Sequence, residues 1–177
     1  KQANANTMIA QLFNQTNQAE KGIVYTRKAV LLFDKINDLS KKNDIIHKIS
    51  KRYLWHYQDT KTSSSLDSSG LFSRLQIEIS RKLNKRGSIA NAFNNLQGIA
   101  FEKNNLSTAL ILLDSSFKYT DQNDYENLRI YYFDKADILS IRKDYTQAAQ
   151  LLDSALHYGK LLQNKASLLI HTSYYHT

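Results

Sequence analysis

The sequence predicts an all-α protein, an α-α superhelix (solenoid) of stacked helical hairpins. Its 177 residues contain no proline and only five glycines, and apolar side chains recur at three- and four-residue spacing, as expected for long helices joined by short turns. The segment 93–117 also returns, altered, as 132–156. Ala109 of the first copy becomes Ala148 of the second, an offset of 39 residues. Such an offset indicates a repeat of two helices around a polar turn.

The first half of the chain is predicted to form two hairpins, at about 3–39 and 43–86. Polar residues at 1–20 carry apolar positions at helical spacing, and a second helix follows to about Leu39. The polar run at 40–44 is predicted to end that helix. Asn43 or Asp44 would then cap the next one, because their side-chain oxygens accept free backbone N–H groups.

That next helix has an apolar stripe over 45–58. The low-complexity segment 59–70 is predicted to be a loop, either an ordinary connection with a frayed first turn or a longer mobile tip. A further helix over 71–83 should end at Asn84-Lys85-Arg86-Gly87, because cations and a left-handed glycine both suit a helix C-terminus.

The second half predicts hairpins at about 88–121 and 124–162, followed by a terminal helix at 165–177. The polar runs 121–124 and 163–164 are interpreted as the breaks between them. Asp121 and Asp124 are better explained as turn and cap residues than as a catalytic pair. The chain begins at Lys1 rather than Met and stops on half a hairpin, so we expect it to be part of a longer protein.

Composition excludes several classes of site. The chain has no cysteine, and so no disulfide, thiolate zinc site or cysteine nucleophile. No apolar run approaches the roughly 18 residues of a membrane span, and we expect no signal peptide within these residues. The net charge of +8 comes from Lys and Arg scattered among acidic residues, which favours a solvated surface over a nucleic-acid site.

The sequence gives no sign of enzymatic chemistry. None of the five histidines forms an HExxH pair or lies at ligand spacing from carboxylates. No phosphate-binding glycine loop or G-x-S-x-G elbow occurs. We therefore predict a protein that is not an enzyme, with no catalytic residues, no metal and no cofactor.

One helix mixes cations with aromatic residues, namely Lys48, Lys51, Arg52, Tyr53, Trp55 and Tyr57. Charge and stacking of this kind serve single-stranded nucleic acid. The interpretation we favour is that the aromatics form the core stripe and the lysines its solvated face. Nucleic acid is therefore an unfavoured partner. The tyrosines that cluster in the second half are expected to pack mostly between repeats.

The repeated segment resembles a tetratricopeptide repeat. The matching positions are Phe93, Leu96, Asn104-Asn105-Leu106, Ala109, Leu113 and Ser116 in the first copy, and Tyr132, Ala136, Asp144-Tyr145, Ala148, Leu152 and Ala155 in the second. Gln97 and Lys135 depart from the family's glycine and leucine, and the period is about five residues longer than the usual 34. The pattern is similar to long-helix variants such as kinesin light chains and bacterial Rap-type regulators, and to repeat arrays of Bacteroidetes sensors and transcription regulators.

This resemblance implies that the first helices of the hairpins line a concave groove for a peptide or partner helix. The groove residues it implies are Asn91, Asn94, Asn95, Phe101, Ile130, Phe133 and Asp137. Asparagine side chains there would hydrogen-bond a peptide backbone, and the aromatics would add contact area. Gly98 and Asp137 stand where a carboxylate clamp would place asparagine, so a C-terminal carboxylate is not the expected ligand.

The sequence thus favours a non-enzymatic scaffold or interaction module that binds a protein or peptide. The alternative is the N-terminal sensor region of a bacterial signalling protein or transcriptional regulator. The compartment is left open, with the bacterial periplasm slightly favoured over the cytoplasm. A homodimer could also form through exposed end faces, because terminal repeats normally carry polar caps.

Overall fold

The computed structural model describes residues 1–15 and 18–174, and side chains within them except at 14–15, 19 and 164–174. The described residues form eight α-helices and no strand. The helices are α1 (Gln2–Gln15), α2 (Ala19–Lys35), α3 (Leu39–Thr60), α4 (Ser63–Lys82), α5 (Arg86–Glu102), α6 (Leu106–Tyr119), α7 (Tyr125–Ile141) and α8 (Tyr145–Tyr174). The predicted all-α class is confirmed.

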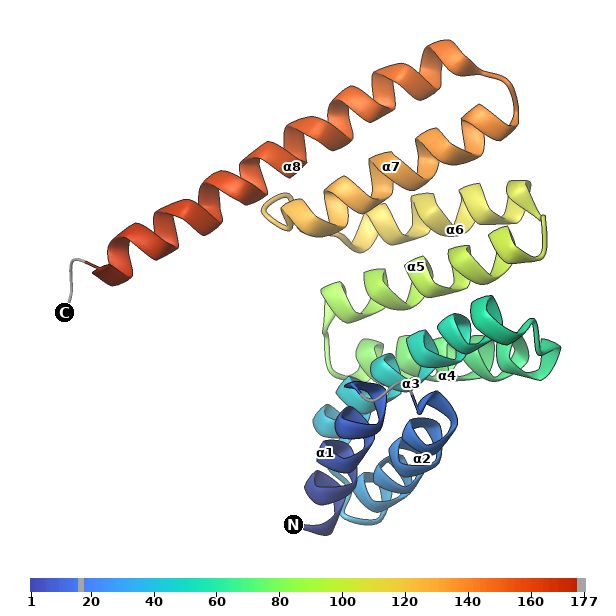
Figure 1. Cartoon of the computed structure of the whole chain (residues 1–177), viewed down its shortest axis with the longest axis vertical. Helices are drawn as coiled ribbons and strands as arrows, with labels where there is room; N and C mark the ends of the chain where they lie inside the picture. The colour runs from blue at the N-terminus through green and yellow to red at the C-terminus, as the bar shows by residue number, and fades with distance from the viewer. Residues whose placement is uncertain (16–17, 175–177) are drawn as a thin grey trace.

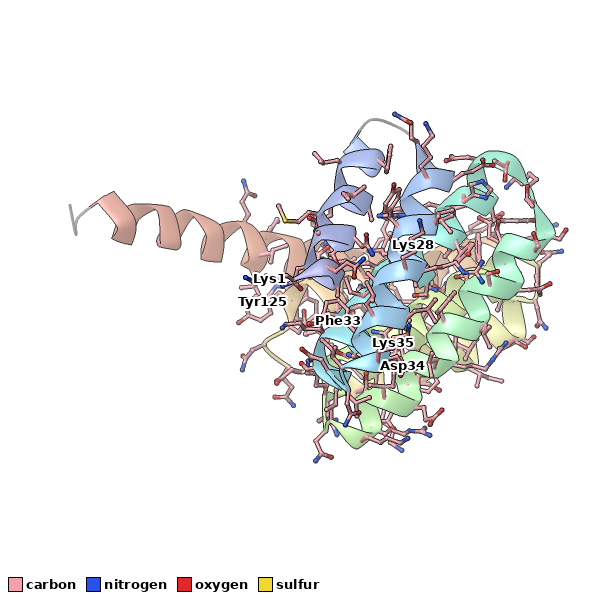
Figure 2. All side chains as sticks on the ribbon, turned by 90° about the horizontal axis from the view of Figure 1, so that it is seen from below. Lys1, Lys28, Phe33, Asp34, Lys35 and Tyr125 are labelled. Atoms are coloured by element: carbon pink, nitrogen blue, oxygen red, sulfur yellow. The ribbon has the colours of Figure 1, made fainter. Side chains whose placement is uncertain are left out.

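Each helix packs against the next helix in the chain, most extensively within the pairs α1–α2, α3–α4, α5–α6 and α7–α8. The four pairs follow one another along the long axis of the molecule (Figure 1). Helix α3 also contacts α5, which is not its neighbour in the chain. The last part of α8 extends beyond the other helices, as the view from below also shows (Figure 2).

Short polar turns set where the helices begin. Asp38, Asn105 and Asp124 cap α3, α6 and α7, and each side chain accepts a hydrogen bond from the backbone N–H three residues later. Such caps satisfy N–H groups that have no partner within the helix. The prediction that Asp124 is a cap residue is confirmed. Before three of the turns an asparagine (Asn37, Asn84 or Asn104) takes a positive φ, which asparagine tolerates better than most residues.

Small side chains allow the helices to approach one another. Ala109 on α6 is fully buried in a cluster with Ala100, Leu113, Tyr131 and Ile138, which come from α5, α6 and α7. Apolar residues of two neighbouring helix pairs, α5–α6 and α7–α8, therefore share one core cluster.

The predicted loop at 59–70 is wrong, because only Lys61 and Thr62 separate α3 from α4. Two of the serines that suggested a loop, Ser65 and Ser69, are buried instead, and the Ser69 hydroxyl donates to the Ser50 carbonyl oxygen at 2.7 Å. A serine that satisfies its hydroxyl in this way replaces alanine as the small residue between helices.

The other predicted boundaries shift for local reasons. The run 40–44 does not end a helix but lies inside α3, which Asp38 caps in place of Asn43 or Asp44. Asn43 is instead buried, and its Oδ1 accepts from Ser80 Oγ at 2.8 Å. Gly87 lies inside α5, because Asn84 supplies the left-handed residue at the end of α4.

The predicted break at 163–164 is also wrong, because α8 continues through it to Tyr174. Glutamine is a good helix former, and neither glycine nor proline stands at 163–164. The terminal helix expected at 165–177 is therefore the continuation of α8 as far as Tyr174. Residues 175–177, which include Tyr175 and His176 of the sequence analysis, lie outside the described residues.

Candidate functional site

Helices α3, α5 and α7 together line two adjoining cavities. The first has a volume of about 230 Å³ and the second about 220 Å³. Gln97, Gly98 and Asp134 line both, so the two form one continuous depression, called here the α3–α5–α7 groove. A Cβ atom on Gly98 would lie 3.0 Å from Leu54 Cδ2. Glycine therefore lets α3 and α5 approach closely at the floor of this groove.

The structure brings together six of the seven groove residues named from the sequence. Asn91, Asn94, Asn95 and Ile130 line the first cavity, and Phe101 and Asp137 line the second. Phe133 lines neither and is 52% exposed. On α7 the groove face runs through Asn127, Ile130, Asp134 and Asp137, at the three- and four-residue spacing of a helix. The same spacing, applied strictly, selects Asp134 in place of Phe133.

Two asparagines place unpartnered oxygen atoms at the first cavity. Asn95 is buried, and its Nδ2 donates to Ser69 Oγ at 2.9 Å and Ser73 Oγ at 2.7 Å. Asn94 Nδ2 donates to Asn127 Oδ1 at 3.4 Å. The Oδ1 atoms of Asn94 and Asn95 are buried and accept no hydrogen bond from the described residues. An unmet buried acceptor costs about 1–3 kcal/mol, so an N–H group that reached either atom would stabilise it.

Gln97 lies where the two cavities meet. Its side chain is 6% exposed and hydrogen-bonds none of the described residues. Buried amides are normally paired. In the sequence, Gln97 is notable only as a departure from the family's glycine, so its place in the groove was not predicted.

Two carboxylates of α7 face the second cavity. Burial, and next the negative charge of Asp137, raise the pKa of Asp134 to about 6, while Arg129 opposes this shift. Arg129 is paired with Glu126, Nη2 to Oε1 at 2.8 Å. Neither Asp134 nor Asp137 forms an ion pair or hydrogen bond with a described residue. The groove therefore holds two acidic groups that form no ion pair with the described part of the chain.

The opposite wall of the groove, on α3, is basic and aromatic. Burial and the nearby charge of Lys51 lower the pKa of His47. Lys51 Nζ lies 5.4 Å from the centroid of the Trp55 ring, and Trp55 is 54% exposed. Tyr53 is buried, as the core-stripe interpretation predicts, but Trp55 is not a core residue. Its indole instead forms part of the groove wall.

The shift at Asp134 makes stability depend on pH. The native state holds this proton up to about pH 6, whereas a free aspartate loses it near 3.8. The unfolded state therefore binds fewer protons in this window, so the contribution of Asp134 to stability is largest below pH 3.8 and is lost as the pH rises through 6. The difference in unfolding free energy between Asp134→Asn and the wild type should therefore rise by about 1–2 kcal/mol, in favour of the variant, from pH 4 to pH 8.

The measurement is urea denaturation at a series of pH values, with Asp153→Asn on the exposed surface of α8 as the matched control. The difference between Asp134→Asn and the wild type should grow up to about pH 7 and then level off. A difference that does not change with pH would show that the carboxyl of Asp134 is not perturbed by folding.

Among the described residues, no group of three His, Asp or Glu side chains is placed to hold a metal ion. No helix in the described ranges is long and apolar enough to cross a membrane.

A scan against protein-family models and a search of curated proteins find no match. Among solved structures, the chain matches the crystal structure of BtubC (BKLC) from P. vanneervenii with a TM-score of 0.74 and 11% sequence identity. The match covers 91% of this chain but 64% of that protein, so the chain spans less than two thirds of its length. At this identity the likeness shows the fold alone, an all-helical fold with repeat-like character.

Proposed function

We propose that this chain is a non-enzymatic interaction module, a tetratricopeptide-like solenoid that binds an extended segment of a partner protein in the α3–α5–α7 groove. The solenoid is supported by the chain-order packing of the four helix pairs and by the 39-residue offset between Ala109 and Ala148. The observation that carries the function is the pair of buried, unpartnered Oδ1 atoms of Asn94 and Asn95.

An extended peptide suits these atoms. The peptide backbone offers an N–H donor at nearly every residue. Asparagine oxygens that accept hydrogen bonds from these donors do not require one particular peptide sequence. Ile130, Leu54 and Trp55 supply the apolar contact area of the same cavity, where anchoring side chains contribute most of the binding energy. The groove thus combines polar acceptors with an apolar floor, as ligand sites commonly do.

A large side chain placed in the groove should weaken peptide binding. Asn91 is partly exposed, lines the first cavity and hydrogen-bonds none of the described residues, so Asn91→Trp should occupy the cavity without breaking a contact. We expect peptides selected from a phage-displayed random library against the wild type to bind this variant at least about tenfold more weakly, a loss of about 1.4 kcal/mol. Fluorescence anisotropy with the labelled peptide measures the change.

Ile111→Trp is the matched control, because Ile111 is an exposed residue of α6 away from both cavities. Its affinity should stay within about twofold of the wild type. Asn95→Ala is not a suitable probe, since Asn95 also ties α5 to the serines of α4. Selected peptides that bind Asn91→Trp as tightly as the wild type would show that the groove is not the site.

A further inference from the structure

The acidic groups of the α3–α5–α7 groove differ in how they are neutralised. Glu102 accepts a hydrogen bond from Gln58 Nε2 at 2.9 Å and pairs with Lys61 Nζ at 3.4 Å. Asp134 and Asp137, which line the same second cavity, have no such partner among the described residues. The chain carries 24 Lys and Arg residues against 16 Asp and Glu, yet none of the described cations forms an ion pair with these two carboxylates.

The two carboxylates lie close enough to act on one ligand. Asp134 and Asp137 are three residues apart on α7, so they share one helix face with Cβ atoms about 5–6 Å apart. Their mutual repulsion is one of the causes that disfavour ionised Asp134. A cation bound between them would remove this repulsion and restore part of the solvation lost by burial.

Gln97 independently points to a ligand at the same place. The residue is more than nine-tenths buried, lines both cavities, and its amide has no hydrogen-bond partner among the described residues. The carbonyl oxygen of this amide can accept an N–H group, and its NH₂ can donate to a peptide carbonyl. Gln97 and the two carboxylates together offer acceptors from two helices, α5 and α7, around one cavity.

We propose that Asp134, Asp137 and Gln97 form a subsite for an arginine side chain of the bound protein segment. This inference rests on the proposed function and names the feature of the partner that the groove selects. A guanidinium carries five N–H donors in a planar fork that can contact both carboxylates and the glutamine oxygen at once. The ammonium of lysine is a compact, strongly hydrated charge and spans two carboxylates less well.

The neighbouring charges leave room for this cation. Arg129, the basic residue that acts on Asp134, is held by Glu126. Lys51 and His47 line only the first cavity, on the side of α3. The second cavity, of about 220 Å³, has the space of several water molecules at about 30 Å³ each. A guanidinium therefore fits without displacing a basic side chain of the chain itself.

A peptide array tests the subsite. Random nonapeptides are prepared in sets whose central residue is fixed as arginine, lysine, citrulline or glutamate, and each set is probed with labelled protein at physiological salt. Citrulline keeps the shape of arginine but has no charge. We expect the arginine set to bind about tenfold or more above the citrulline set and also above the lysine set. Because the protein is net positive, non-specific attraction would favour the glutamate set instead.

Three variants separate the two proposals. The double variant Asp134→Asn with Asp137→Asn should lose the preference for arginine, whereas Asp153→Asn, the same change on the surface of α8, should keep it. Circular dichroism checks that each variant is folded.

If the arginine and citrulline sets bind equally and Asn91→Trp abolishes both, the groove binds peptides but the arginine subsite is wrong. Retention of the preference in the double variant also refutes the subsite. If no set binds, or Asn91→Trp binds every set as the wild type does, both proposals fail.

Discussion

Replacing Leu113 by alanine is expected to lower the free energy of unfolding by about 2–5 kcal/mol, the range for a buried leucine whose cavity cannot collapse. Leu113 on α6 is 0% exposed. It packs in one cluster with Ala100, Tyr131 and Ile138, which lie on α5 and α7. Because backbone from three helices surrounds the site, a small movement of one helix does not fill the space left by the side chain. Urea denaturation followed by far-ultraviolet circular dichroism gives the value.

Ile111→Ala is the comparison within the same helix. Ile111 is 67% exposed, so its truncation should change the unfolding free energy by no more than about 0.5 kcal/mol. Similar losses for the two variants would mean that α6 is not packed between α5 and α7 as described. A selective loss at Leu113 would locate the core between consecutive helix pairs.

Placing tryptophan at Ala148 should destabilise the chain by about 1–3 kcal/mol or more, because overpacking forces neighbouring side chains and backbone apart. Ala148 is 2% exposed in the second turn of α8, and its N–H donates to the Asp144 carbonyl oxygen at 3.0 Å. Helix α7 is the main packing partner of α8. An indole at this position would therefore separate the two helices near the turn that joins them.

Ala149→Trp is a matched control, since Ala149 is the adjacent residue and is exposed. It carries the same substitution in the same helix and should unfold within about 0.5 kcal/mol of the wild type. Thermal and urea denaturation measure both variants. Equal destabilisation would mean that α8 tolerates no tryptophan for reasons of helix propensity, and that the small residue at 148 has no special role in helix packing.

The fold was predicted well where the sequence carries both a capping residue and regular apolar spacing after it. The turn before α7 has a capping aspartate, Asp124, followed by regular apolar spacing, and the predicted start lies within one residue of the observed start. The segment 59–70 shows the opposite case. Serine is typical of loops in a local sequence, but Ser65 and Ser69 are buried helix residues whose hydroxyls are hydrogen-bonded. Tertiary packing decides whether such a serine lies in a loop or in a buried helix, and a local sequence pattern does not show this packing.

Part of the groove lining could be predicted from the sequence. The family resemblance selected α5 and α7, two of the three helices that line the cavities, and the predicted Asn91, Asn94 and Ile130 line the first cavity. No groove residue was named on α3, because the contact between α3 and α5 depends on Gly98 meeting Leu54 across the fold. Phe133 was named in place of Asp134, although strict helical spacing from Ile130 reaches Asp134 and Phe133 lines neither cavity.

The proposed binding function is tested most directly by NMR chemical-shift mapping of the backbone amides during titration with a peptide selected against the wild type. The largest chemical-shift changes are expected on the groove face, at Asn91, Asn94, Gln97, Ile130 and Asp134. The variant Asn91→Trp should remove these changes. Changes confined to α1 and α2, or to the faces of α4 and α6 outside the groove, would contradict the proposed function.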